Sequence, residues 1–206
     1  MKEIVRLVVA LTAIAVGAAL ILSLVESATR APIAEQRRLQ MVKALKAVLP
    51  EIDNQPDTDS VTLAAGTNAK GKPVERTFYR GRQQGALVGV AFKVIAPDGY
   101  SGNIEIMAGV DPQGTVTGIE ILSSSETPGL GARISEPAFK GQFAGKSLDN
   151  ADWRVKKDGG SFDQITGATI SPRAVVKALK EGLEFFKQHR DAIVAAPAPA
   201  AKEQTP

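Results

Sequence analysis

The sequence predicts an α+β protein: an N-terminal transmembrane helix, then a domain in which helices flank an antiparallel sheet. Three patterns carry this prediction. Residues 7–25 contain no charged side chain. Between residues 74 and 123, four strand-like segments are separated by short turns, as in antiparallel sheets. From residue 171 onward, apolar residues recur every three or four positions, which is the spacing of an amphipathic helix.

The composition excludes several classes of protein. With 44% hydrophobic and 23% charged residues, the chain of 206 residues is neither disordered nor fibrous. Lys and Arg are scattered among Asp and Glu, and the net charge is only +3, so we expect no nucleic-acid partner. The absence of Cys excludes disulfides, thiolate zinc sites and Cys-ligated iron–sulfur clusters. With His189 as the only histidine, we predict no metal site and no catalytic triad.

The uncharged run over residues 7–25 is long enough to cross about 30 Å of hydrocarbon as a helix. A cleaved signal peptide is the alternative, but its apolar core would be shorter, about 7–15 residues. We therefore expect an uncleaved single-pass anchor in contact with lipid, preceded by a short tail, residues 1–6. Charge leaves its orientation open, because Lys and Arg occur on both sides of the run and long downstream domains cross membranes largely regardless of charge.

Residues 26–60 are predicted to form a helical linker and a loop. Apolar residues recur at helical spacing from residue 32 to residue 49, and Pro50 ends the pattern. The polar stretch 51–60 is rich in turn-forming residues. The folded domain is expected over residues 61–190, and the Ala/Pro-rich tail 191–206 is expected to be disordered.

Within the domain, strands are predicted over residues 74–80, 86–95, 104–110 and 116–123. A short helix over 135–143, with Ser135 as its cap, and a short strand over 153–155 are expected next. Ser171 and Pro172 open the last helix, because Ser is a good N-cap and Pro fits the first turn. The buried stripe of this helix is predicted to comprise Val175, Val176, Leu179, Leu183 and Phe186.

Two segments carry residues suited to binding. In the first, residues 125–132, Gly129 and Gly131 let the backbone approach a flat ligand closely, although the segment taken alone is also compatible with a purely structural turn. In the second, residues 159–172, Thr166, Thr169 and Ser171 lie directly before a helix N-terminus, where free amides and the helix dipole favour a phosphate. The spacing of a P-loop or a dinucleotide-binding fingerprint is missing.

The second segment resembles a known flavin attachment motif. Asp163-x-x-Thr166-Gly167-Ala168-Thr169 is similar to Asp-x-x-(Ser/Thr)-Gly-Ala-(Thr/Ser) of FMN-binding domains. The stretch from Glu126 to Gly131 resembles the loop of that family that lies against the isoalloxazine ring, and Tyr100-Ser-Gly-Asn-Ile resembles its Gly-Tyr-x-Gly-x-Ile segment. Together with the N-terminal span, these segments resemble the RnfG family, the G subunits of Rnf electron transport complexes.

The resemblance implies a residue-level hypothesis for the site. FMN would be linked covalently through its phosphate to the hydroxyl of Thr169 by a flavin transferase. The linkage would be surrounded by Thr166, Gly167 and Ala168, and the ring would be contacted by Glu126, Thr127, Leu130 and Gly131. Asp163 is expected to serve transferase recognition or a turn rather than the ring. Trp153 either borders the flavin or belongs to the core, and Lys156 or Lys157 could steady the phosphate.

The resemblance also implies a role in a membrane complex. The chain would relay electrons as a subunit of an ion-translocating ferredoxin:NAD oxidoreductase complex in the inner membrane, with other membrane subunits as partners. The FMN domain would lie on the periplasmic side. Three alternatives remain open: a subunit like NqrC of the sodium-translocating NADH:quinone reductase, a flavin-free anchored scaffold, and a self-sufficient flavin reductase. A lipoprotein is excluded because a lipobox needs Cys.

Overall fold

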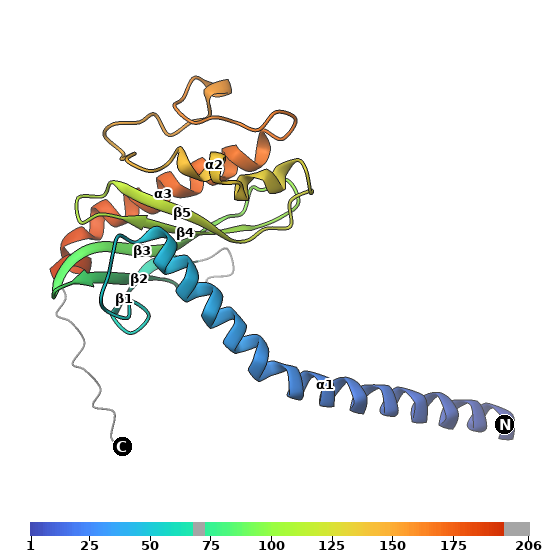
Figure 1. Cartoon of the computed structure of the whole chain (residues 1–206). Coiled ribbons are helices and arrows are strands. Elements are labelled where there is room, and N and C mark those ends of the chain that lie inside the picture. Colours follow the sequence, from blue (N-terminus) through green and yellow to red (C-terminus); the bar gives the residue numbers. More distant parts are fainter. Residues whose placement is uncertain (68–72, 196–206) are drawn as a thin grey trace, which may run out of the picture. The chain divides into compact units, whose positions relative to one another are not determined.

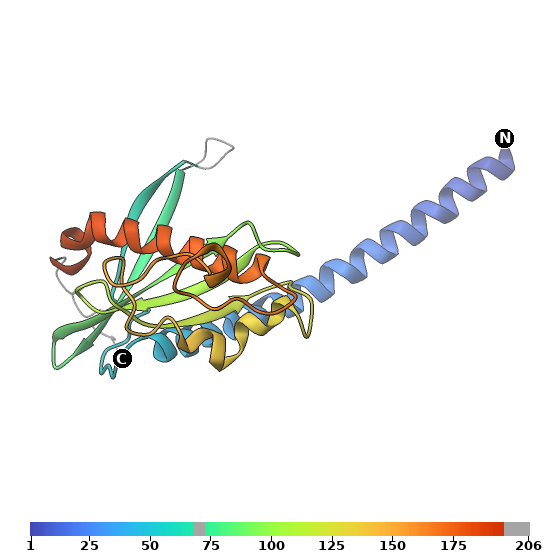
Figure 2. The same cartoon turned by 90° about the horizontal axis from the view of Figure 1, so that it is seen from above.

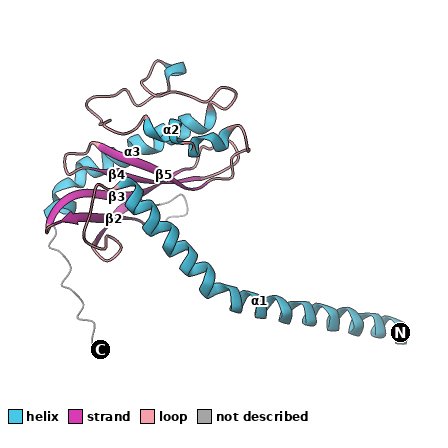
Figure 3. Ribbon diagram, viewed as in Figure 1, coloured by secondary structure: helices cyan, strands magenta, loops and turns pink. Residues whose placement is uncertain are grey.

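The computed structural model describes residues 1–67 and 73–195 (Figure 1). Contacts divide the chain into two compact units, Met1–Met41 and Val42–Pro206. The first unit is helical, and the second holds a five-stranded sheet with helices (Figure 3). The predicted α+β class, with an antiparallel sheet and flanking helices, is confirmed.

The N-terminal helix α1 extends from Lys2 to Val48 and contains the predicted span. The predicted tail 1–6 is thus helical from Lys2, and the helix predicted to start at Pro32 is the continuation of the same helix. A proline inside a helix removes one backbone donor, and here the helix continues through it. The large apolar side chains of the predicted span are exposed, with Leu22 at 70%. Within the described residues, α1 is the one helix long and apolar enough to cross a membrane.

The sheet is an antiparallel meander in which every strand pairs with its sequence neighbour. Its strands are β1 (Ser60–Thr67), β2 (Pro73–Gln83), β3 (Ala86–Ala96), β4 (Ile104–Val110) and β5 (Val116–Ser123). The four predicted strands are β2 to β5, whereas β1 falls in a stretch for which no strand was predicted. Gln84 and Gly85, both with positive φ, join β2 to β3, and this is the conformation that a tight two-residue hairpin requires.

Helix α3 (Ile170–Ala195) covers one face of the sheet (Figure 2). The predicted stripe is buried over its whole length, and Phe186 stacks on Phe92 of β3 with ring centroids 6.2 Å apart. The helix continues past residue 191, so the prediction of a disordered tail from that residue is wrong for residues 191–195. Ile193 is fully buried, and its burial explains why the helix extends this far. Residues 196–206 lie outside the described residues.

The end of α1 lies against the opposite face of the sheet, where glycines make room for it. A methyl group on Gly89 of β3 would lie 2.9 Å from Pro50 Cδ, and one on Gly109 of β4 would overlap the Val48 carbonyl. Thr117 of β5 donates a hydrogen bond to the same carbonyl at 2.5 Å. Residues 42–50 are therefore part of the folded unit rather than a free linker.

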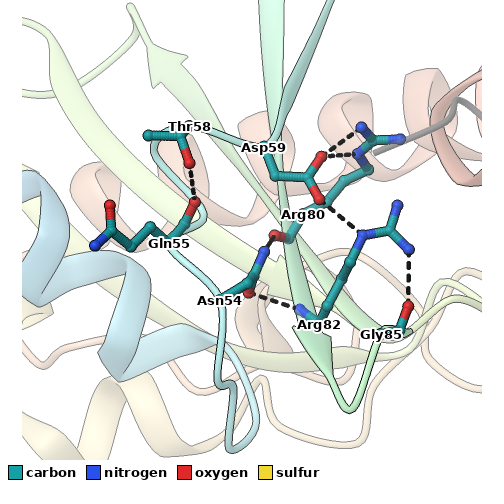
Figure 4. A network of polar contacts seen from close by, with 7 residues as sticks. All are labelled: Asn54, Gln55, Thr58, Asp59, Arg80, Arg82 and Gly85. Carbon is teal, nitrogen blue, oxygen red and sulfur yellow. Dashed lines mark hydrogen bonds and ion pairs between the residues drawn. The ribbon is translucent and has the colours of Figure 1, made fainter. Parts of the chain in front are cut away.

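The loop after α1 is fixed to β2 by a buried ionic network (Figure 4). Asp59 is 5% exposed and forms ion pairs with Arg80, which is 1% exposed, and with Arg82 at 2.7 Å. Asn54 donates to the Arg80 carbonyl at 2.9 Å and accepts from the Arg82 N–H at 2.8 Å. The side chains of the predicted polar loop thus fix it to β2 beyond Tyr79, where β1 no longer pairs with that strand.

Residues 131–169 form an irregular layer beside α3 (Figure 1). The predicted helix over 135–143 is confined to α2 (Pro137–Gly141), preceded by the 3-10 turn η1 (Gly131–Ser135), so Ser135 does not cap it. The predicted strand over 153–155 is reduced to one bridge between Val155 and Phe162, and the 3-10 turn η2 (Lys156–Asp158) follows. The packed rings of Phe143, Trp153 and Phe162 hold this layer together with backbone hydrogen bonds between residues 152–156 and 160–162.

Candidate functional site

The segment 166–169 forms a tight turn directly before α3. The Ala168 N–H donates to the Ile165 carbonyl at 3.0 Å, and Gly167 has a φ of +80°. A type II turn requires positive φ at its third residue, and glycine adopts it without strain. Thr166 and Gly167 are exposed, whereas Ala168 and Thr169 are half-buried. The turn ends directly before α3, and Thr169 therefore lies at the start of that helix.

Thr169 immediately precedes the first residue of α3. The Arg173 N–H donates to the Thr169 carbonyl at 3.2 Å and closes the first turn of the helix. The N–H groups of Ile170 and Ser171 come before this bond, and the first amides of a helix have no partner within it. The helix dipole adds partial positive charge at the same point. A phosphate on the Thr169 hydroxyl would face these groups.

Ser171 does not have its predicted role as the N-cap. The helix begins one residue earlier, at Ile170, and Ser171 is only 1% exposed. Its hydroxyl donates to Glu126 Oε2 at 2.7 Å, so a buried tertiary partner replaces the local capping bond. Pro172 lies in the first turn of α3. A backbone N–H there would have no acceptor within the helix, so the missing N–H of proline costs no hydrogen bond.

The loop after β5 presents the second predicted segment. The N–H groups of Leu130 and Ala132 both donate to the Thr127 carbonyl at 3.1 Å, and Gly129 has a φ of +74°. Thr127 and Leu130 are exposed, while Gly131 and Glu126 are buried. Of the four residues predicted to contact the ring, two therefore face outward and two lie beneath them.

The three segments that were predicted separately meet at Glu126. Its Oε1 accepts the Ser101 N–H at 3.1 Å, from the turn between β3 and β4, and its Oε2 accepts the hydroxyl of Ser171 in α3. The loop also approaches the turn before α3, because a methyl group on Gly167 would lie 3.5 Å from Leu130 Cδ2. The contacts at Glu126 thus bring the three predicted segments together.

Each of these segments contributes one exposed, large apolar side chain. Tyr100 is 69% exposed, Leu130 is 45% exposed and Ile170 is 44% exposed. Apolar side chains that gather on a surface commonly mark a place where a ligand or partner binds. Tyr100 and Ile170 were not predicted as site residues. The signal for Tyr100 was its place in the Tyr100-Ser-Gly-Asn-Ile segment, and the signal for Ile170 was its position directly after Thr169.

The secondary candidates divide into surface and core residues. The Asp163 carboxylate is 68% exposed and pairs with Lys156 at 2.7 Å, so it points into solvent. Trp153 is 6% exposed, its ring lies 4.8 Å from that of Phe162, and its indole N–H donates to the Ser147 carbonyl at 2.9 Å. Trp153 is therefore a core residue, and Lys157 lies on the surface.

An additional cation lies near the helix start. Arg173 follows Thr169 by four positions, and residues at this spacing are neighbours on a helix. Its guanidinium makes two hydrogen bonds to Asp158, of 2.7 Å and 2.8 Å. These bonds lower the pKa of the Asp158 carboxyl and raise the pKa of Arg173, so both groups stay charged at neutral pH. Arg173 is thus a charged residue in the first turn of α3 whose guanidinium is already paired with the Asp158 carboxylate.

The residues present fit FMN. Its phosphate matches the amides at the start of α3, and its flat ring matches the apolar side chains of Tyr100, Leu130 and Ile170. Among residues 1–67 and 73–195, no cluster of three or more His, Cys, Asp or Glu side chains could hold a metal ion. The arrangement is thus suited to holding a phosphorylated aromatic cofactor.

Comparison with known proteins agrees with this site. Residues 99–184 match the family model of the FMN-binding domain. The G subunit of the ion-translocating oxidoreductase complex of Aliivibrio fischeri (strain ES114) is 41% identical over 199 residues, which cover 93% of each chain. The corresponding protein of Pseudomonas aeruginosa (strain PAO1) is 43% identical over 188 residues, covering 87% of this chain and 86% of the relative.

Solved structures show the same fold at lower identity. NqrC of Shewanella oneidensis superposes with a TM-score of 0.52 at 23% identity, covering 67% of this chain and 70% of that one. The C subunit of the Na⁺-translocating NADH-quinone reductase of Parabacteroides distasonis gives a TM-score of 0.50 at 21% identity, covering 70% and 79%. Because the relatives that match over most of their length are G subunits, this chain belongs to the RnfG family of ion-translocating oxidoreductase complexes.

Proposed function

We propose that this chain is an electron-transfer subunit of a Rnf-type ion-translocating ferredoxin:NAD oxidoreductase complex and carries FMN covalently linked to Thr169. The observation that carries the proposal is the position of Thr169. It lies at the N-terminus of α3, which is one of three segments that meet at Glu126 and each present an exposed apolar side chain. The family membership supports the complex as the setting.

The linkage to Thr169 is a phosphodiester. The Thr169 hydroxyl oxygen forms a bond to the phosphorus of an activated flavin nucleotide, the bond from phosphorus to its leaving group breaks, and the hydroxyl proton is released. A flavin transferase supplies the catalysis for this step. The start of α3 then stabilises the phosphate charge by about 0.3–1 kcal/mol, which is too little for permanent retention. The covalent bond keeps the cofactor in place between electron transfers.

The bound flavin supplies redox chemistry, and the protein supplies position and electrostatics. Thr127 and Leu130 are the predicted ring contacts that face outward, and we assign the direct contact to them together with Tyr100 and Ile170. Thr166, Gly167 and Ala168 shape the turn that holds the phosphate. Asp163, exposed at the start of the motif, is available to the transferase rather than to the ring.

The attachment is tested by expressing the chain with its flavin transferase and viewing a denaturing gel under ultraviolet light. We expect a fluorescent band for the wild type and for Thr169→Ser, which retains a hydroxyl, and none for Thr169→Ala. Ser161→Ala is the control, because it removes an exposed hydroxyl that lies outside the motif and should stay fluorescent. A dark wild-type band would favour a flavin-free scaffold instead.

We place the FMN domain on the periplasmic side of the inner membrane, with residues 7–25 as the single span. The chain has no Cys, so one introduced thiol reports the side unambiguously. Asp191 is suitable because its side chain is 99% exposed. A membrane-impermeant maleimide should label Asp191→Cys in spheroplasts with a sealed inner membrane and label Lys2→Cys only after permeabilisation. The opposite pattern would place the domain in the cytoplasm.

A further inference from the structure

Glu126 is a buried carboxylate held by two neutral donors from distant parts of the chain. It is 6% exposed. The Ser101 N–H is 25 positions away in sequence, and the Ser171 hydroxyl is 45 positions away. Burying a charged group without hydrogen bonds is costly, so these two bonds fix both the carboxylate and the segments that supply the donors.

Two glycines leave space for this carboxylate. A methyl group on Gly131 would lie 2.6 Å from Ser171 Oγ and would also overlap Glu126 Oε2. A methyl group on Gly99 would lie 2.9 Å from Glu126 Oε1. The packing of Glu126 thus requires glycine at position 131, whereas at position 99 the Gly102 carbonyl, which the same methyl group would also overlap, is the tighter constraint. The predicted reason for a glycine at position 131 was close approach of the backbone to a flat ligand. The structure gives a different reason, which is the space that the Glu126 side chain occupies.

The segments joined by Glu126 are the same three that present Tyr100, Leu130 and Ile170. Ser101 follows Tyr100, Ser171 follows Ile170, and Glu126 begins the loop that contains Leu130. Thr169 is only two positions from Ser171. One carboxylate thus links the attachment residue to each exposed apolar side chain of the site.

We propose that Glu126 is a positioning residue for the flavin. Its two hydrogen bonds hold the turn at Ser101, the loop 126–131 and the N-terminus of α3 as one preformed cradle, so that a ring linked to Thr169 takes a single orientation. This proposal rests on the proposed attachment of FMN at Thr169. Glu126 acts from beneath the surface, through hydrogen bonds rather than through contact with the ring.

The decisive variants separate hydrogen bonding from charge. Glu126→Ala removes both bonds. Glu126→Gln removes the charge but can keep both bonds, because its oxygen accepts from the Ser101 N–H while its amide donates to the Ser171 hydroxyl, which can also accept. Glu136→Ala is the matched control, since Glu136 is a nearby carboxylate that is 48% exposed and pairs with Arg133.

Two readouts are measured on the full chain in detergent. In the flavin-free Thr169→Ala background, we expect amide hydrogen exchange at Ser101 to become about five- to tenfold faster in Glu126→Ala, the factor expected for one lost hydrogen bond. In flavin-loaded chains, the fluorescence anisotropy of the flavin should fall towards that of free FMN. Glu126→Gln and Glu136→Ala should stay close to the wild type in both readouts.

The proposal is overturned if Glu126→Ala matches the wild type in both readouts. It is also overturned if Glu126→Gln fails as Glu126→Ala does, because charge rather than hydrogen bonding would then hold the segments. If Glu126→Ala does not fold, Ser171→Ala replaces it and must lower the flavin anisotropy, because it removes the bond that joins Glu126 to α3. If the wild-type protein carries no flavin, the proposed attachment at Thr169 is contradicted. Amide hydrogen exchange at Ser101 still tests whether Glu126 holds the three segments together.

Discussion

Replacing Thr169 by Ala in the assembled complex is expected to reduce electron transfer to the background rate without preventing assembly. Without the hydroxyl no phosphodiester can form, so the relay lacks its redox group. The folding cost should stay small, because replacing a threonine at the start of a helix by alanine typically costs about 1 kcal/mol. Electron transfer through the purified complex measures the first effect, and co-purification of the variant with the other subunits measures the second.

Two controls make this result specific. Thr169→Ser keeps a hydroxyl at the same position and should retain a large part of the rate. Ser161→Ala removes an exposed hydroxyl outside the motif and should behave like the wild type. A Thr169→Ala complex that transfers electrons at the full rate would show that this flavin is not on the electron path.

Replacing Asp59 by Ala is expected to lower the free energy of unfolding by about 3–5 kcal/mol, the usual cost of breaking a buried ion pair. Asp59 pairs with both Arg80 and Arg82, and Arg80 is 1% exposed. Loss of the carboxylate removes the negative charge that balances these guanidinium groups. Urea unfolding of the full chain in detergent, followed by near-ultraviolet circular dichroism, measures the change.

A surface ion pair supplies the matched control for Asp59. Asp149 pairs with Lys187 at 3.0 Å, but its side chain is 80% exposed. Exposed pairs contribute little, so Asp149→Ala should change the free energy of unfolding by less than about 0.5 kcal/mol. Equal effects at the two positions would mean that the network drawn in Figure 4 does not stabilise the fold.

Local sequence patterns predicted most of the sheet and the last helix. Residues 86–95, with apolar side chains on both faces, and residues 104–110 gave clear strand signals, because central strands are buried on both faces. The β1 strand was missed because its sequence, SVTLAAGT, contains small residues that form no strong apolar pattern. The extent of α1 was also missed, because residues 7–25 and 32–49 were predicted as two separate helices, whereas α1 continues through Pro32.

The site was predicted as segments, and its internal contacts were not. The attachment motif and the Glu126 loop could be recognised from their residue order. The Glu126 side chain points inward because Ser101 and Ser171 donate hydrogen bonds to it. Both donors are far from Glu126 in sequence, so the residues around Glu126 could not predict this orientation. Ser171 shows the same limit, since a serine before a helix favours capping locally and the buried carboxylate of Glu126 overrides that preference.

The most direct test of the attachment is mass spectrometry of one tryptic peptide. Cleavage after Lys157 and Arg173 releases residues 158–173, which contain four hydroxyl residues, Ser161, Thr166, Thr169 and Ser171. Fragmentation of this peptide from the wild-type protein should place one FMN, added with loss of water, on Thr169. An unmodified peptide from protein co-expressed with the transferase, or FMN on any of the other three residues, would contradict the account.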